Sequence, residues 1–182
     1  MGKAGGGSMI FIVAPAFPCH HPPLPPLKKA DRMQTFVATL GGDPALALHP
    51  CYQGYFVCFN EGRYYEAHDV LEHLWLQEGR EGGNHAFYKG LIQLAGAFVH
   101  LRQQSEQPTH AKHGRRLRPA ARLFALASGN LAAYEPTHLG LDVQAVRELC
   151  ARQMALLVGA DFTRNPWQPG HLPRVFPERL VP

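Results

Sequence analysis

Apolar residues recur at helical spacing through the middle of the chain, and this pattern predicts five helices. Gly62 and Gly79 follow two of the periodic stretches and mark their ends. The connections are short, so helices that follow one another in sequence should pack as antiparallel neighbours. The sequence therefore predicts an all-α, compact bundle of about five helices, which cover residues 51–60, 63–78, 84–104, 110–127 and 141–158.

Glycine and proline gather at the two ends of the chain, where the helical pattern is lost. We expect residues 1–43 to form a disordered or irregular Gly/Pro-rich leader, residues 44–160 the helical domain, and residues 161–182 a Pro-rich tail. Within the leader, the apolar run 10–13 is the only strand-like stretch. Trp167 and Phe176 of the tail should lie over the bundle or over a partner.

The predicted helix 63–78 places two ionisable residues near apolar ones. At about 100° per residue, with His68 at 0°, Glu72 falls near 40°, Trp75 near 340° and Tyr64 near 320°. Burying an unpaired carboxylate or imidazolium costs several kcal/mol, so both groups need polar partners or a metal ion. Residues one turn apart can contact the same cation. Asp69 falls on the arc that we expect to be solvated.

A second polar line runs along the predicted helix 84–104, where Gln93 and His100 share a face. If this line meets the His68 face, His100 becomes a third metal ligand and Gln93 a supporting polar group. A glutamine is a poor ligand for a transition metal, but it can orient a water molecule or a carbonyl group. If the line meets water instead, neither residue has a special role.

Three sequence runs together resemble the family called domain of unknown function 309: FNxGxYYEA at 59–67, HxxxExxW at 68–75 and GLIQLA at 90–95. The resemblance extends over roughly residues 51–159. It implies a small helical protein of the kind found in bacteria and archaea. It also implies a suspected metal-binding role for the HxxxExxW run, that is, for His68 and Glu72 with Trp75 beside them.

Composition supports a single globular domain and limits the partners. Of the 182 residues, 46% are hydrophobic and 18% are charged, which is enough apolar material for a packed core. The formal charge is +4, and much of it comes from residues 112–122. The arginines of this segment could meet the phosphates of RNA or of a small ligand, but a solvated helix face explains them better. A nucleic-acid partner is therefore not indicated.

The four cysteines form no C-x-x-C pair. Cys51 and Cys58 stand two helical turns apart, about 10 Å by helix rise, which is too far for a disulfide. We read the cysteines as buried thiols of a cytoplasmic protein. No apolar run approaches the ~18 residues of a membrane span, so no membrane association is expected.

Two hypotheses follow. In the first, His68, Glu72 and His100 bind a divalent metal, zinc or manganese, with a water molecule completing the shell, and the protein is a hydrolase. In the second, the protein is a non-enzymatic interaction or assembly module. There His68, Glu72, Trp75 and Gln93 form a buried polar network, and the exposed apolar surface binds a partner or a second copy, giving a homo-oligomer. No G-x-S-x-G elbow, H-E-x-x-H run or phosphate-binding glycine loop is present, and no substrate is indicated.

Overall fold

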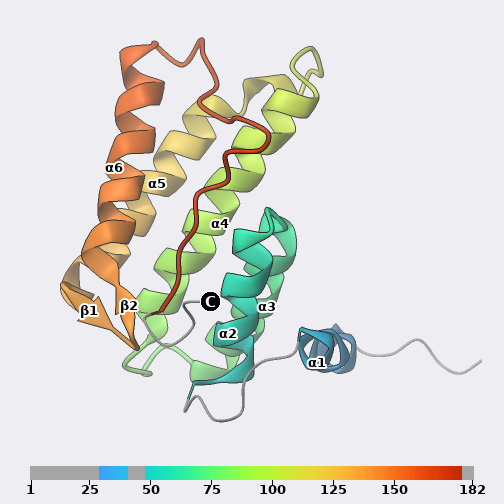
Figure 1. Ribbon diagram of the computed structural model, residues 1–182, viewed down its shortest axis with the longest axis vertical. Coiled ribbons are helices and arrows are strands. Elements are labelled where there is room, and N and C mark those ends of the chain that lie inside the picture. The colour runs from blue at the N-terminus through green and yellow to red at the C-terminus, as the bar shows by residue number, and fades with distance from the viewer. Residues whose placement is uncertain (1–28, 41–47, 178–182) are drawn as a thin grey trace, which may run out of the picture.

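The computed structural model describes residues 29–40 and 48–177, and this part of the chain is mostly helical (Figure 1). Two short 3₁₀ helices, η1 (His113–Arg115) and η2 (Ala132–Tyr134), and one small hairpin of β1 (Thr137–His138) and β2 (Leu141–Asp142) accompany the helices. The all-α class is confirmed. The described residues form six α-helices: α1 (Lys29–Thr39), α2 (Pro50–Asn60), α3 (Tyr64–Glu78), α4 (His85–Glu106), α5 (Leu117–Leu131) and α6 (Val143–Gly159).

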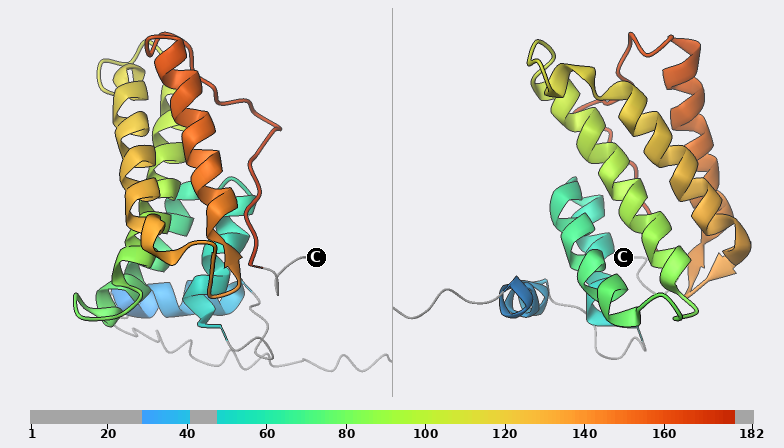
Figure 2. Two further views of the ribbon diagram at one scale, coloured as in Figure 1. Left: turned by 90° about the vertical axis from the view of Figure 1, so that its left-hand side faces the viewer. Right: turned by 180° about the vertical axis from the view of Figure 1, so that it is seen from behind.

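The longest helix, α4, lies in the middle of the bundle. The pair α2–α3 packs on one side of it and the pair α5–α6 on the other, as the front and rear views show (Figures 1 and 2). Helix α1 lies apart from the bundle axis and contacts α2 and α3. This arrangement gives α4 two boundaries, one with α3 and one with α5.

Helix α1 lies within the leader that the sequence predicts to be irregular. Its apolar residues Met33, Phe36, Val37 and Leu40 recur at helical spacing and pack on the core, with Val37 buried. The leader is therefore helical over Lys29–Thr39. The strand-like run 10–13 lies outside the described residues.

The predicted helix 110–127 begins later than expected. Residues His113–Arg115 form η1, and α5 starts only at Leu117. Pro119 falls in the first turn of α5, where an amide hydrogen has no partner within the helix, so proline does not disturb it. The hairpin of β1 and β2 lies in the connection between α5 and α6.

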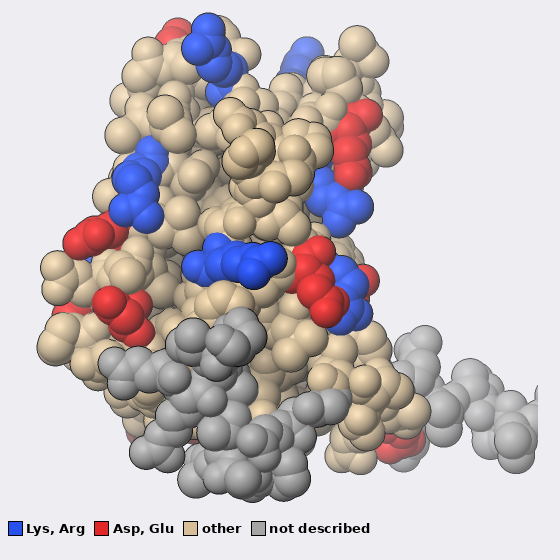
Figure 3. All heavy atoms as spheres, viewed as in Figure 1, with Lys and Arg blue, Asp and Glu red and all other residues tan. Residues whose placement is uncertain are grey.

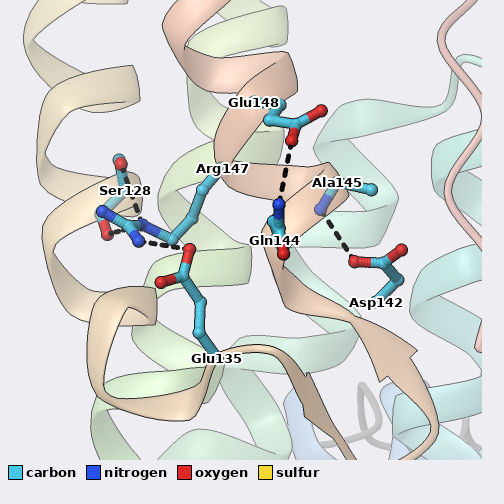
Figure 4. A network of polar contacts seen from close by, with 7 residues as sticks. All are labelled: Ser128, Glu135, Asp142, Gln144, Ala145, Arg147 and Glu148. Atoms are coloured by element: carbon cyan, nitrogen blue, oxygen red, sulfur yellow. Dashed lines mark hydrogen bonds and ion pairs between the residues drawn. The ribbon is translucent and has the colours of Figure 1, made fainter.

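A hydrogen-bonded corner fixes α6 against α5 (Figure 4). Asp142 caps α6, because its carboxylate accepts a hydrogen bond of 2.8 Å from the amide of Ala145. Arg147 of α6 donates through Nε to the carbonyl oxygen of Ser128 on α5, at 3.1 Å, and forms an ion pair with Glu135. The corner thus joins both helices to the loop between them.

The segment after α6 runs back along the bundle beside α4 (Figure 1). Asn60, at the end of α2, holds it with two hydrogen bonds of 2.8 Å, one donated to the carbonyl of Val175 and one accepted from its amide. Asn165 donates to the carbonyl of Leu101 on α4 at 2.7 Å, and the ring of Trp167 packs against Tyr64. The expectation that Trp167 covers the bundle is confirmed.

The cysteines within the described residues are unpaired and buried, as the sequence predicts. They are Cys51, Cys58 and Cys150, whereas Cys19 lies outside the described residues. Among the helices that the structure describes, none is both long and apolar enough to cross a lipid bilayer.

Replacing Asn60 with alanine should release the C-terminal segment from α2. Losing two hydrogen bonds should lower the free energy of unfolding by about 1–3 kcal/mol. In limited trypsin digestion of the folded protein, cleavage after Arg174, next to the released Val175, should become faster. The matched control is Gln168→Ala, an exposed residue of the same segment. Equal cleavage rates in wild type and Asn60→Ala would show that the clamp does not hold the segment.

Candidate metal site

Helix α3 buries one face against α2 and α4. Its buried residues are Tyr64, Ala67, Val70, Leu71 and Leu74. This face is centred away from His68, so His68 and Glu72 lie at its border and are half-buried. The expectation that these two side chains point into the interior is therefore corrected. The buried face is also narrower than the apolar arc of the helical wheel, because Tyr65 and Leu76, which fall near 60° and 80° from His68 on that wheel, are 64% and 65% exposed.

Three side chains of α3 converge at this border. His68, Asp69 and Glu72 each offer a ligand atom, and these atoms all lie within 4.8 Å of one another. His68 Nδ1 lies 3.3 Å from Asp69 Oδ1, and the two side chains are 35% and 30% exposed. An imidazole with two carboxylates is a donor set that zinc and manganese accept.

Asp69 is the member of this cluster that the sequence analysis missed. Its place on the helical wheel, about 100° from His68, suggested a solvated side chain. The signal that could have found it is its spacing from Glu72, because residues three apart on a helix are neighbours just as residues four apart are.

Local structure sets the start and end of α3. Gly62, with φ of 75°, adopts the left-handed conformation that lets the chain turn between α2 and α3. The carbonyl of Arg63 then accepts the first helical hydrogen bond, from Ala67, at 2.9 Å. Gly79, with φ of 70°, ends the helix. The two glycines thus lie at either end of one uninterrupted helix, in which His68, Asp69 and Glu72 keep helical spacing.

Two aromatic residues singled out from the sequence lie on the core side of α3. Tyr64 is buried, and its ring stacks on Phe98 with centroids 5.1 Å apart. Trp75 packs against His85, at 4.9 Å between ring centroids. The Tyr64 hydroxyl and the Trp75 indole nitrogen are buried without a hydrogen-bond partner among the described residues. Both residues thus act mainly through packing.

Comparison with known families agrees with the resemblance found in the sequence. Residues 52–111 match the model of the family described as Domain of unknown function (DUF309). The matched segment contains α2, α3 and α4 and therefore the whole His68–Asp69–Glu72 cluster. The expected resemblance extended to residue 159, whereas the match ends at 111. Neither the curated proteins nor the solved structures gave a match.

Within the DUF309 segment, the polar line of α4 faces α5. Asn130 of α5 donates a 2.7 Å hydrogen bond to Gln93 Oε1. Arg116, which precedes α5, lies 3.4 Å from His100 Nδ1 through its Nη1 atom. The structure thus brings Asp69, and not His100, together with His68 and Glu72. Gln93 and His100 belong to the α4–α5 boundary.

The buried cysteines of the described residues are poor nucleophiles. Burial raises the pKa of the Cys58 thiol to about 11 and that of Cys150 to about 12. Both thiols are therefore protonated near neutral pH, whereas the thiolate is the reactive form. Neither thiol is therefore a candidate nucleophile.

The surroundings of His100 predict a pH effect on stability. Burial, Arg116 and His113 lower the pKa of His100 below its ordinary 6.5. The unfolded chain therefore binds this proton more readily, so the stabilisation is complete above pH 6.5 and is lost as the pH falls below it. His100→Gln should reduce the loss of unfolding free energy between about pH 7.5 and 5.5, as measured by urea denaturation.

The control for this measurement is His171→Gln, an exposed histidine of the C-terminal segment. This variant should lose stability on acidification as the wild type does. An undiminished loss in His100→Gln would assign the pH effect to the other histidines.

Proposed function

We propose that His68, Asp69 and Glu72 bind one divalent cation, zinc or manganese. The observation that carries this proposal is the convergence of one imidazole and two carboxylates, with ligand atoms within 4.8 Å. Two donors around a tetrahedral zinc ion lie about 3.4 Å apart, given metal–ligand distances of about 2.1 Å. The separation of His68 Nδ1 and Asp69 Oδ1, 3.3 Å, already fits this value.

The partial exposure of the cluster supports an open site. Three ligands on one helix leave the solvent side of the ion to water, whereas a structural zinc site is closed by four protein ligands. A bound ion of this kind lowers the pKa of its water ligand toward neutrality. We therefore propose metal-dependent hydrolysis as the reaction class. His68, Asp69 and Glu72 would hold the ion, and no residue is assigned as base.

A second candidate function is a non-enzymatic assembly module. The observation that favours it is the exposure of two large apolar side chains on α3, Tyr65 and Leu76, next to the cluster. A second copy of the chain could cover them. In this case the contact between His68 and Asp69 would be structural. Sedimentation analysis of wild type and of Leu76→Ser distinguishes this function, since it requires an oligomer that the variant weakens.

Metal binding should stabilise the protein and should depend on His68. With zinc or manganese at about 100 times its dissociation constant, a bound ion contributes about 2.7 kcal/mol, which raises Tm by about 5–10 °C for a domain of this size. The rise should disappear in His68→Ala and in Glu72→Gln. The measurement is thermal unfolding of protein purified without a histidine tag, with and without metal.

The matched control is His73→Ala, the residue after Glu72, whose ring contacts Gln77 and lies outside the cluster. This variant should keep the full rise in Tm. An equal rise in wild type and His68→Ala would assign the binding to other histidines and contradict the proposed site.

The reaction class has a separate test. Metal-loaded protein should hydrolyse an activated ester or phosphate ester, such as p-nitrophenyl acetate or p-nitrophenyl phosphate. EDTA should abolish this activity, added metal should restore it, and His68→Ala should lack it. If the wild type binds metal but hydrolyses neither compound faster than free metal does, the hydrolase part is wrong for these ester classes while the metal site stands.

A further inference from the structure

The net positive charge of the chain comes from one segment. Residues 107–134 contain five Lys and Arg residues and no Asp or Glu. The whole chain has a formal charge of +4, so the rest of it carries +4 minus +5, or −1. The five cations lie around η1 and in the first half of α5. They are Lys112, Arg115, Arg116, Arg118 and Arg122.

Two of these arginines line a groove between α4 and α5. His100 contributes from α4, and the other lining residues are on α5. The groove has a volume of about 550 Å³, which is within the range of small-molecule sites. Its lining combines cationic groups with apolar ones. The lining residues are His100, Arg118, Pro119, Arg122, Leu123 and Leu126.

Of the two arginines of the groove, only one has an acidic partner among the described residues. Arg118 and Arg122 are four residues apart on α5, and like charges at this spacing destabilise a helix. Arg118 lies 3.5 Å from Asp161 in an exposed ion pair, and its guanidinium lies over the ring of Phe162 at 4.2 Å. Arg122 forms no ion pair with any residue that the structure describes. An anion between the two guanidinium groups would relieve their repulsion.

His100 adds a neutral donor to the groove. The guanidinium of Arg116 can only donate, so His100 Nδ1 accepts its hydrogen bond and Nε2 carries the proton in the neutral ring. Burial and the nearby cations favour this neutral form by lowering the pKa of His100. The groove therefore offers one neutral N–H donor beside two guanidinium groups.

We propose that this groove binds a small organic anion, in which a phosphate or carboxylate group is attached to an apolar body. Arg118 and Arg122 would hold the anionic group, since guanidinium groups match both anions in geometry. Leu123, Leu126 and Pro119 would contact the apolar body. The site is formed by α4 and α5 and does not use the cluster on α3.

The distribution of charge favours a small ligand over a nucleic acid. The face shown in Figure 3, over which the C-terminal segment runs, carries positive and negative side chains in small mixed groups, so no track of cations extends over this face. A polynucleotide needs a track of cations along its backbone. The groove instead pairs its cations with exposed leucine, Leu126 being 43% exposed.

The test is calorimetric titration of the full chain with 2-naphthyl phosphate, 2-naphthoate, inorganic phosphate and 2-naphthol. One of the two naphthyl anions should bind more tightly than both inorganic phosphate and 2-naphthol, and which one shows whether the site takes phosphate or carboxylate. Arg122→Gln should weaken its binding about tenfold, the value expected for a lost charge-assisted hydrogen bond. Leu126→Ser should weaken binding of the naphthyl anion and leave that of inorganic phosphate unchanged.

The matched control is Arg115→Gln, which removes the same charge from the same segment but does not line the groove. It should change affinity less than twofold. Equal weakening by Arg115→Gln and Arg122→Gln would indicate diffuse attraction and overturn the proposal, as would tighter binding of inorganic phosphate than of either naphthyl anion. Tighter binding of a single-stranded RNA oligonucleotide, weakened equally by both variants, would identify a polyanion surface instead. Should Arg122→Gln fail to fold, Arg118→Gln serves in its place.

Discussion

The contacts of one phenylalanine on α4 hold the bundle together. The ring of Phe98 stacks on Tyr64 of α3 and meets Phe59 of α2 and Phe124 of α5 edge to face, with centroids 5.1 to 5.6 Å apart. It also contacts Trp167 of the C-terminal segment, at 6.5 Å. Each such pair adds about 0.5–1.5 kcal/mol beyond burial. Three helices and the returning segment are thus positioned by a single side chain.

This constraint decides which way α3 faces. Because Tyr64 must stack on Phe98, the buried side of α3 is the one that continues through Leu71 and Leu74. His68 and Glu72 are rotated away from that side and reach solvent at its border. The cluster is therefore accessible to an ion from solution. Its carboxylates also avoid the large cost of full burial.

The sequence predicts helices well here because apolar periodicity and glycine stops are local signals. Helices α2, α3, α4 and α6 lie within about three residues of their predicted bounds. The orientation of each helix is not local. On a wheel centred on His68, Tyr65 and Leu76 fall beside Glu72 and extend the apolar arc, although both are exposed in the structure. Periodicity alone does not show which apolar residues the neighbouring helix covers.

The same limit explains the placement of Gln93 and His100. Their shared line on α4 was recognised in the sequence, but α4 has neighbours on two sides, and a wheel does not say which one the line meets. Because Phe98 stacks on Tyr64, the opposite face of α4 packs against α3, and the polar line of α4 faces α5. The wheel also places Asp69 about 100° from His68, on the arc expected to be solvated. This angle does not show that Asp69, three residues before Glu72, lies beside Glu72 on the helix.

Helix α4 also lies between the two candidate sites, the cluster on α3 and the groove beside α5. The DUF309 match covers α2 to α4 and contains all three residues of the acidic cluster. The match ends at residue 111, just before the first cation of the basic segment 107–134, and therefore does not include Arg118 and Arg122. Only His100, on the α5 side of α4, lies within the match and lines the basic groove. The cluster can therefore be described from the matched segment alone. The groove exists only where α5 packs against that segment, so the features that set its charge belong to the part of the chain outside the family match.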